Sequence, residues 1–397
     1  MKKFKRIFII VMDSAGIGAM KDAAKFHDAG TNTFVHTSIR CGGLNIPTLE
    51  SLGIRDLGPV VGTKVVSHPQ AYSMILNEAS NGKDTMTGHW EMMGILTTKP
   101  FQTFTDHGFP QALIDELEEK TGHKVIGNYA SSGTEILVKL GEEQMKENSL
   151  IVYTSADSVL QIAAHEEVTG VKELYRCCEI AREICMRPEY LVGRVIARPF
   201  IGKDATSFKR TSNRHDYALS PSGITAMDIL KEHGYEVSCI GKIYDIFNGA
   251  GATRTQKTIS NVDGMNKTIE EAKNKDYEGI CFVNLVEFDS EYGHRRNPIG
   301  YGHCFEEFDV KLKELLEVIH DDDLVLVTAD HGNDPTHTGT DHTREHVPLL
   351  CYSKLFKEGH MLDERNSFAD IGATILENFG LTKDPSMIGT VIEDLLK

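Results

Sequence analysis

Long hydrophobic runs are absent from this sequence. Although 40% of its 397 residues are hydrophobic, no stretch approaches the ~20 consecutive apolar residues that a membrane-spanning helix needs. The N-terminal segment imitates a secretory signal, with basic residues before an apolar stretch, but that stretch is short and Asp13 interrupts it. We therefore predict a cytoplasmic protein with no membrane partner.

Cysteine motifs and excess positive charge are also missing. The eight cysteines are scattered, and the one close set, Cys177, Cys178 and Cys185, has neither Cys-x-x-Cys spacing nor a histidine beside it in the sequence. We expect reduced, mostly buried thiols. The formal net charge of −16 would repel nucleic-acid phosphates, so we predict no nucleic-acid partner. A small anionic ligand would need metal ions or clustered basic side chains to hold it.

Internal repeats and low-complexity segments are absent too, and nothing in the sequence indicates an obligate protein partner. The length of 397 residues exceeds the usual size of a single hydrophobic core. Strand-like runs alternate with helical patterns up to about Thr98 and again from Ser222, which is typical of a doubly wound, mostly parallel α/β sheet. We expect a metal-binding catalytic core at 1–98 and 220–397, with a smaller α/β cap domain inserted at 99–219.

Individual elements can be placed within this core. The patterns predict a helix over Gly223–Gly234, a strand over Glu236–Ile240 and a helix over Asn266–Lys273. A further helix is expected to begin near Ser367, whose side chain would cap it with Asp370 three residues later.

One short apolar run ends in a cluster of metal-ligand side chains. Leu324–Val327 has the composition of a strand buried on both faces, and Asp330 and His331 follow at its carboxyl end. His342 returns from the Gly- and Thr-rich loop that comes next. Open α/β sheets place their chemistry at this edge. An oxygen and two imidazoles suit Zn or Mn better than Mg or Ca, whereas an isolated Asp-His pair would more often be solvated.

Two further runs end in the same way. The first apolar run of the chain stops at Asp13, and another, beginning at Gly279, leads to Asp289 with His294 in the next turn. Three strands thus deliver a carboxylate to one edge. Ionised acids in an apolar setting need a compensating cation, so the pattern indicates a two-metal catalytic site.

A nucleophile for phosphoryl chemistry should lie close to such metals. The segment Asn81–Gly94 has the pattern of a glycine turn that opens onto a helix, where a phosphorylated hydroxyl would gain main-chain N–H groups and the positive end of the helix dipole. Thr85 and Thr87 both qualify, and either could instead be only an N-cap. The residues alone leave these alternatives open.

Several motifs together resemble the alkaline phosphatase superfamily of metalloenzymes and, within it, the phosphopentomutase family. The resemblance spans essentially the whole chain, and its most specific motifs are Val11–Gly18, Gly82–Glu91, Ile196–Phe200, Thr211–Tyr217, Ala329–Asp334 and Asp341–His346. It implies a core of alkaline phosphatase type with two Mn²⁺ ions. It also implies the ligands: Asp13, Asp330, His331 and the nucleophile Thr85 for one ion, and Asp289, His294 and His342 for the other.

The resemblance also implies a reaction. Phosphorylated Thr85 would interconvert α-D-ribose 1-phosphate and D-ribose 5-phosphate, or the 2-deoxyribose phosphates, through a bisphosphorylated sugar. A bisphosphate such as glucose 1,6-bisphosphate would first phosphorylate the threonine. Arg194, Arg210 and Lys242 are the implied phosphate contacts. We assign Asp157 to a sugar hydroxyl because both metal sites are already filled, and His89 is a weaker candidate for a phosphate contact.

Alternative functions remain on the same core. A phosphatase or phosphodiesterase would release inorganic phosphate, whereas a phosphoglycerate mutase-like enzyme would be expected to use a serine and a longer chain. A metal-binding protein without activity is disfavoured because every expected ligand is present. The sequence leaves open the oligomeric state, the metal bound in the cell and the preference between ribose and deoxyribose.

Overall fold

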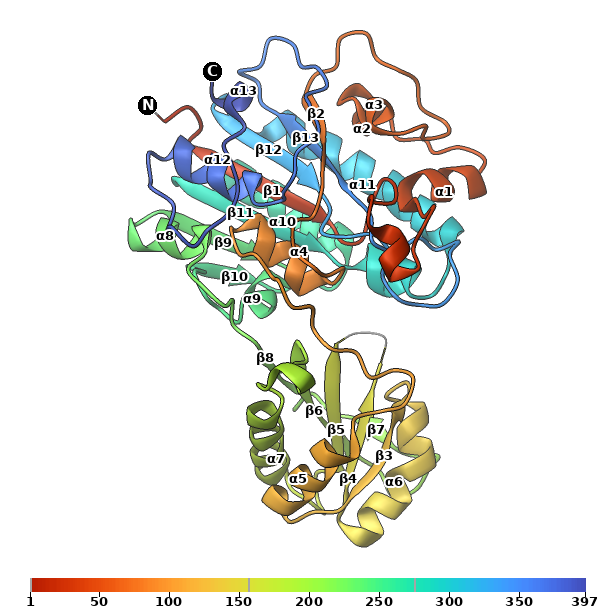
Figure 1. Ribbon diagram of the computed structural model, residues 1–397. Helices are drawn as coiled ribbons and strands as arrows, with labels where there is room; N and C mark the ends of the chain where they lie inside the picture. Colours follow the sequence, from red (N-terminus) through yellow and green to blue (C-terminus); the bar gives the residue numbers. More distant parts are fainter. Residues whose placement is uncertain (1, 156–157, 275) are drawn as a thin grey trace. The chain divides into compact units, whose positions relative to one another are not determined.

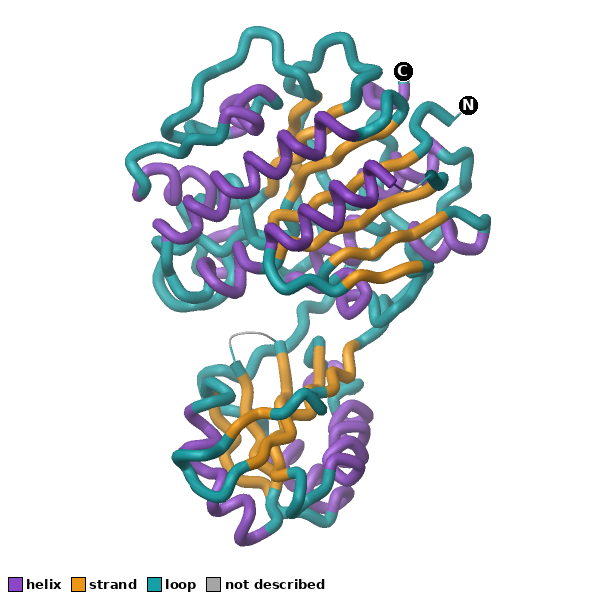
Figure 2. Tube along the Cα trace, turned by 180° about the vertical axis from the view of Figure 1, so that it is seen from behind, coloured by secondary structure: helices purple, strands orange, loops and turns teal. Residues whose placement is uncertain are grey.

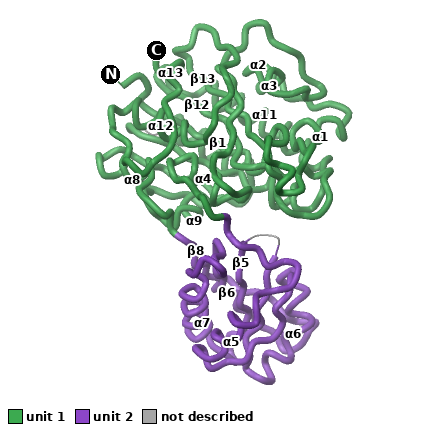
Figure 3. The backbone as a smooth tube through the Cα atoms, in the orientation of Figure 1, with its two compact units in different colours: residues 1–99, 220–397 green, residues 100–219 purple. Residues whose placement is uncertain are grey.

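The chain folds into two compact units, one of which is inserted into the other (Figure 3). The structure, a computed structural model, describes residues 2–155, 158–274 and 276–397. Unit 1 comprises Met1–Lys99 and Ser220–Lys397, and unit 2 comprises Pro100–Leu219.

A seven-stranded sheet forms the centre of unit 1, in the order β10-β9-β11-β1-β12-β13-β2 (Figure 1). The five strands from β10 to β12 are parallel, whereas β13 is antiparallel to both β12 and β2. The expected mostly parallel α/β core is therefore confirmed. The strands are β1 (Arg6–Met12), β2 (Tyr72–Leu76), β9 (Glu236–Ile240), β10 (Arg254–Gln256), β11 (Gly279–Leu285), β12 (Asp323–Thr328) and β13 (Val347–Tyr352).

The three central strands, β11, β1 and β12, are buried along their whole length. Strands covered on both faces need apolar side chains at nearly every position, which explains their continuous apolar sequence. At the amino end of this layer, the buried guanidinium of Arg6 donates to Asp323, with Nε–Oδ1 at 2.8 Å and Nη2–Oδ2 at 2.6 Å. This ion pair holds β1 against β12. At the other end, Met12 lies opposite Leu285, so the residues that follow β1, β11 and β12 emerge along one edge.

Helices cover both faces of this sheet. The long helices α10 (Asn261–Asn274) and α11 (Pro298–Val318) pack together across the face turned to the viewer in Figure 2. The opposite face, seen in Figure 1, carries α4 (Thr85–Met92), α8 (Ala226–Glu232), α9 (Ile243–Ile246) and α12 (Asp370–Asn378). The shorter elements of unit 1 are η1 (Ala23–Phe26), α1 (Thr33–Arg40), α2 (Pro47–Ser51), α3 (Ile54–Leu57), η3 (Phe288–Gly293) and α13 (Glu393–Leu396).

The predicted strand and helices are present, but the helix bounds differ: α8 is Ala226–Glu232, and α10 begins at Asn261 instead of Asn266. The strand Glu236–Ile240 is β9, and the two helices predicted over 223–234 and 266–273 correspond to α8 and α10. The prediction that Ser367 caps the next helix is wrong. That helix begins at Asp370, and the Ser367 hydroxyl donates to Glu91 at 2.8 Å. The Ser367 oxygen accepts from the main-chain N–H of Ala369 at 3.1 Å, in the turn that precedes the helix.

Unit 2 is a smaller α/β structure built on a six-stranded sheet. Its order is β3-β4-β5-β6-β7, with β8 also paired to β6. The helices α5 and α7 pack on one face and α6 on the other. The elements are α5 (Gln111–Thr121), β3 (Val125–Ala130), α6 (Glu135–Glu147), β4 (Leu150–Thr154), β5 (Val159–His165), α7 (Val171–Ile184), η2 (Pro188–Tyr190), β6 (Arg194–Ile201), β7 (Lys209–Arg210) and β8 (His215–Ala218).

The cysteines and the helix lengths complete the description. All eight cysteines are free thiols and seven of them are buried, as the sequence predicts. Across residues 2–155, 158–274 and 276–397, no helix combines the length and the apolar character that a membrane crossing requires.

Candidate metal centre

Six of the predicted ligands lie in two groups at the carboxyl edge of the unit 1 sheet. Asp13 follows β1, Asp330 and His331 follow β12, and these three form one group. The other group consists of Asp289 in η3, the adjacent His294, and His342 from the loop before β13. Within each group the potential ligand atoms all lie within 4.8 Å of one another.

The first group surrounds the Nε2 atom of His331. This nitrogen lies 3.5 Å from Asp13 Oδ1, 3.3 Å from Asp330 Oδ2 and 3.1 Å from Thr85 Oγ1. Both aspartates are completely buried, yet Asp13 Oδ1 and Asp330 Oδ2 have no hydrogen-bond donor among the described residues. A buried carboxylate oxygen without a donor is costly. A bound cation would offset that cost.

The second group is similarly tight. His294 Nε2 lies 3.0 Å from Asp289 Oδ2 and 3.1 Å from the Nε2 atom of His342, which is itself 3.5 Å from Asp289 Oδ2. The rings of His331 and His342 stack with their centroids 4.0 Å apart, so the two groups are neighbours.

All three histidines are oriented in the same way. Their Nδ1 atoms lie next to main-chain oxygens: Gly332 for His331 at 2.9 Å, Thr340 for His294 at 2.6 Å, and Lys83 for His342 at 2.9 Å. A carbonyl oxygen can only accept, so each Nδ1 must carry the proton and donate it. Each Nε2 is therefore the nitrogen presented to the group. This arrangement is usual for metal-binding histidines.

The electrostatics of the first group favour added positive charge. Burial, together with Asp330 and Asp289, raises the pKa of the Asp13 carboxyl. Burial alone would lower the pKa of His331, but Asp330 and Asp13 outweigh it and hold that pKa well above its usual value. The carboxylates thus impose a negative potential at His331, which a bound cation would offset.

In the second group, the attraction of His294 and His342 outweighs burial and lowers the pKa of Asp289 well below its usual range. Asp289 is therefore a carboxylate available as a ligand.

These residues fit divalent metal ions. Ligands at about 2.1 Å around a tetrahedral ion lie about 3.4 Å from one another, which is close to the 3.0, 3.1 and 3.5 Å separations in the second group. The donors are carboxylate oxygens and imidazole nitrogens, a set that suits Mn or Zn. In the first group, the buried oxygens Asp13 Oδ1 and Asp330 Oδ2, which have no hydrogen-bond donor among the described residues, also favour a bound cation.

The structure distinguishes the two candidate threonines. Asp84 is the N-cap of α4 and accepts from the Thr87 N–H at 3.0 Å, so the suggestion that either threonine is that cap is wrong. Thr87 is buried and its hydroxyl donates to Asp84 at 2.6 Å. Thr85, the first residue of α4, is half-buried and directs its hydroxyl toward His331.

Two asparagines that the sequence analysis did not identify hold the aspartates in place. The Asn284 side chain donates to Asp13 Oδ2, and that of Asn333 donates to Asp289 Oδ1, both at 2.7 Å. Asn284 lies inside the apolar strand β11, and a buried amide in such a run was the signal that could have identified it.

His89 is also completely buried behind the first group. Its Nδ1 lies 2.8 Å from the main-chain oxygen of Thr85 and 3.2 Å from Asp330 Oδ2.

Two buried charged residues brace the loops around the centre. Arg344 donates to the main-chain oxygens of Glu78 and Gly82, at 3.1 and 2.5 Å, and to the Glu78 carboxylate at 2.6 Å. Its bonds tie the loop before Thr85 to the loop that carries His342.

Glu345 connects its own loop to the two segments that carry Thr33 and Gly18. It accepts from the main-chain N–H of Thr33 at 2.9 Å and from the hydroxyls of Thr33 and Thr343 at 2.8 and 2.7 Å. A longer contact of 3.3 Å reaches the N–H of Gly18.

The predicted substrate contacts are divided between the units. Lys242 is exposed at the start of α9, just beyond the carboxyl end of β9 in unit 1. Arg194 and Arg210 belong to β6 and β7 of unit 2. Asp157 lies outside the described residues.

Arginines gather on one face of the unit 2 sheet. Arg194 lies 3.6 Å from the Asp216 carboxylate, to which Arg214 donates twice at 2.7 Å. Burial lowers the pKa of Arg198, and Arg214 and Arg210 lower it further, which shows that these positive charges are close. Among the residues that the structure describes, Asp216 is the carboxylate that contacts Arg194 and Arg214.

Comparison with known proteins identifies relatives along the whole chain. Residues 5–383 match the model of the Metalloenzyme superfamily. A phosphopentomutase from Clostridium botulinum is 56% identical over 397 residues, with 100% of both chains covered. A phosphopentomutase from Clostridium beijerinckii is 55% identical over 389 residues, covering 98% of each chain, and one from Agathobacter rectalis is 55% identical over 396 residues, again covering 100% of both.

Proposed function

This chain belongs to the Metalloenzyme superfamily and, within it, to the phosphopentomutase family, and we propose that it moves a phosphoryl group between the O1 and O5 positions of ribose by way of Thr85. It is an enzyme of the phosphomutase class. The observation that carries the proposal is the position of the Thr85 hydroxyl, 3.1 Å from His331 Nε2, beside two groups of buried carboxylates and imidazoles.

Each group would hold one divalent ion. Asp13, Asp330, His331 and Thr85 would bind the first, and Asp289, His294 and His342 the second. We propose Mn²⁺ for both, although a site of nitrogen and oxygen ligands binds Zn²⁺ at least as tightly and occupancy follows availability. Such ions, when bound, stabilise negative charge on phosphoryl, entering and leaving oxygens.

Thr85 carries the phosphoryl group between the two halves of the reaction. Phosphorylated Thr85 transfers the group to the free hydroxyl of the sugar phosphate: the bond from phosphorus to Thr85 Oγ1 breaks, a bond to the sugar oxygen forms, and the proton of the sugar hydroxyl is exchanged for the phosphoryl group on Thr85 Oγ1. The resulting ribose 1,5-bisphosphate turns over, and its other phosphoryl group returns to Thr85. A phosphoryl group on Thr85 also lies at the positive end of the α4 dipole.

The inserted unit is proposed to act as a cap. An exposed phosphothreonine would lose its phosphoryl group to water, so a mutase must exclude water while the bisphosphate turns over. The arginines of unit 2 support this role, because paired N–H groups suit a phosphate. We assign Arg194 and Arg210 to the distal phosphate, Lys242 to the phosphate from the side of the core, and Asp157 to a sugar hydroxyl.

The resting enzyme needs an initial phosphoryl donor. We propose that a hexose bisphosphate such as glucose 1,6-bisphosphate supplies it, after which the cycle sustains itself. We also propose a cytoplasmic location, for which eight free thiols are the support, since reducing compartments keep thiols unpaired.

One incubation tests the function. Mn²⁺-loaded protein is mixed with ribose 5-phosphate and a trace of glucose 1,6-bisphosphate, and ribose 1-phosphate and free phosphate are followed together. We expect the isomer with almost no free phosphate. Free phosphate as the main product would make the protein a phosphatase on this fold and would contradict the role of the cap.

A further inference from the structure

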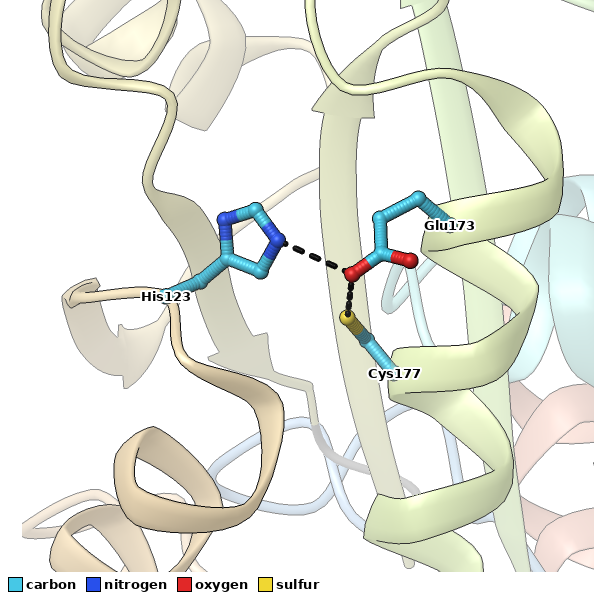
Figure 4. Close-up of side chains that lie close together, drawn as sticks. All are labelled: His123, Glu173 and Cys177. Carbon is cyan, nitrogen blue, oxygen red and sulfur yellow. Dashed lines mark hydrogen bonds and ion pairs between the residues drawn. The ribbon is translucent and has the colours of Figure 1, made fainter.

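A third cluster of potential ligands lies in unit 2, remote in sequence from the centre described above. Glu173 and Cys177 are four residues apart on α7, so they lie on the same face of that helix. His123, from the turn between α5 and β3, points at them (Figure 4). His123 Nε2 lies 3.1 Å and Cys177 Sγ lies 3.8 Å from the same oxygen, Glu173 Oε1.

The orientation of His123 suits a metal ligand. Its Nδ1 lies 2.7 Å from the main-chain oxygen of Asn148, which can only accept, so Nδ1 carries the proton and donates it. The Nε2 lone pair is then directed at Glu173 and Cys177. His331, His294 and His342 are held in the same manner, and metal-binding histidines usually are. Without a bound cation, the lone pair on Nε2 of a neutral His123 would face the lone pairs of Glu173 Oε1, which is unfavourable.

The separations match those around a small ion. With Zn–S at about 2.3 Å and Zn–N and Zn–O at about 2.1 Å, tetrahedral geometry places O and S about 3.6 Å apart and N and O about 3.4 Å apart. The observed values of 3.8 and 3.1 Å differ from these by no more than a side-chain adjustment. We propose that His123, Glu173 and Cys177 form a binding site for a thiophilic divalent cation of the zinc class, independent of the proposed function.

The surroundings are compatible with this site. Arg176 donates to both oxygens of Glu173, at 2.9 and 2.6 Å, but a carboxylate has about four lone pairs and Oε1 still faces the other two ligands. Arg176 lowers the pKa of Glu173 to about 2, so an ionised oxygen is present at neutral pH.

Charge balance also permits binding. Burial raises the pKa of Cys177 to about 12, with Glu173 adding to the effect, so the thiol is protonated until an ion displaces its proton. The thiolate formed in this way and the Glu173 carboxylate would together balance the charge of a divalent ion. Cys177 is completely buried, but the side chains of His123 and Glu173 are 14% and 34% exposed, which provides an entry path.

A bound ion would cross-link two helices. It would connect the end of α5, just before His123, to the first turns of α7, and these two helices pack against each other. Bound metal should therefore raise the unfolding temperature of unit 2, because an ion that binds only the folded state stabilises it.

Cadmium is the probe of choice, because the two metal groups of unit 1 contain no cysteine and only a thiolate gives the ultraviolet charge-transfer band. Full-length, Mn²⁺-loaded protein is titrated with Cd²⁺ in a Cys41→Ser background, since Cys41 is the one thiol that is not buried. We expect the band to saturate at about one Cd²⁺ per chain and to be reversed by Zn²⁺.

Variants then assign the ligands. Cys177→Ser should abolish the band, whereas Cys178→Ser, at a neighbouring buried thiol, should keep it. His123→Gln should weaken binding on the order of tenfold or more. Because His123 is partly exposed in the turn between α5 and β3, this variant decides the matter even if Cys177→Ser does not fold. A band absent at excess Cd²⁺, retained in Cys177→Ser, or unaltered in affinity in His123→Gln would overturn the proposal and leave only the hydrogen-bonded contact between His123 and Glu173.

Discussion

The Nδ1 atom of His342 lies 2.9 Å from the main-chain oxygen of Lys83. Lys83 stands two residues before Thr85, so one hydrogen bond joins a candidate metal ligand directly to the loop that carries the candidate nucleophile. The Lys83 side chain adds a second link, because its ammonium lies 3.0 Å from Asp341. These two contacts fix the two loops relative to each other. A substitution that displaces one loop should therefore also displace the other.

The buried guanidinium of Arg344 also joins these two loops, through its bonds to Glu78 and Gly82. Its removal should therefore lower the stability of the fold. In Arg344→Met, the buried Glu78 carboxylate loses the guanidinium that lies 2.6 Å from it. Breaking such a buried pair costs about 3–5 kcal/mol. We expect the free energy of unfolding, measured with denaturant, to fall by this amount and the mutase rate to fall with it.

Two comparisons sharpen this test. The double variant Arg344→Met/Glu78→Gln should recover part of the loss, because no unpaired charge remains. Arg187→Met, which removes an exposed partner of Glu116, should change stability by less than about 1 kcal/mol. A double variant no more stable than Arg344→Met would contradict the explanation.

Thr85→Ala should abolish the reaction. Without the hydroxyl no phosphoenzyme can form, so kcat should fall by at least about a thousandfold and incubation with glucose 1,6-bisphosphate should leave the protein unphosphorylated by mass spectrometry. Thr87→Ser keeps the hydroxyl that donates to Asp84 and should retain both the phosphorylation and the activity. Phosphorylation of the Thr85→Ala protein at Thr87 would assign the nucleophile to the other threonine.

Asp289→Asn should remove one metal ion and spare the other. The amide keeps the size of the side chain but loses the charge that faces His294 and His342. Elemental analysis after dialysis should give about one ion per chain, compared with about two in the unaltered protein. Asp276→Asn, an exposed partner of Lys5, is the matched control and should keep both ions. An unaltered metal content in Asp289→Asn would place the second ion elsewhere.

Arg210→Gln should weaken substrate binding more than it slows the chemical steps. Loss of a charged hydrogen bond to phosphate is worth about 1.5–3 kcal/mol, so KM for ribose 5-phosphate should rise by roughly ten- to a hundredfold, with a smaller change in kcat. Arg187→Gln in the same unit should leave KM as it is. Equal KM values in the two variants would remove Arg210 from the substrate site.

Glu345 should make stability depend on pH. Burial raises its pKa from 4.5 to about 7 in the folded protein, so the folded state holds a proton that the unfolded state releases between these values. Stability from this group is thus highest below pH ~4.5 and declines as the pH rises to ~7, by up to about 3 kcal/mol.

Glu345→Gln isolates this contribution. The amide oxygen can accept from the Thr33 N–H, and the amide N–H groups can donate to the hydroxyls of Thr33 and Thr343, both of which can rotate. Denaturant unfolding at pH 5, 6, 7 and 8 should show the variant gaining stability relative to the unaltered protein as the pH rises. A constant difference across this range would mean that Glu345 does not titrate there.

The position of the centre was predictable because it follows from a rule about sheets. Asp13, Asp289 and Asp330 each follow a continuous apolar run, such a run is a buried parallel strand, and parallel strands end at one edge. The family was predictable for a different reason, since the motifs around Thr85 and His331 resemble it, and full-length relatives at 55–56% identity confirm it.

The supporting contacts were not predictable, because they join segments that no sequence pattern relates. Glu345 receives hydrogen bonds from Thr33, 312 residues away, and the Ser367 hydroxyl donates to Glu91, 276 residues away. Local propensity describes a residue's neighbours in the chain, whereas a buried polar group takes whichever partner the packing places within 3 Å of it.

The same contrast applies to the cysteines. In the sequence, Cys177 has no histidine beside it, so the sequence predicts only that it is a buried, reduced thiol. Only the packing of α5 against α7 brings His123 to within reach of Glu173 and Cys177. The sequence by itself determined which strands form the core and which carboxylates follow their carboxyl ends, because burial and strand direction follow from the local hydrophobic pattern. The tertiary structure decided how those side chains pair, because ligand geometry depends on distances between segments far apart in the chain.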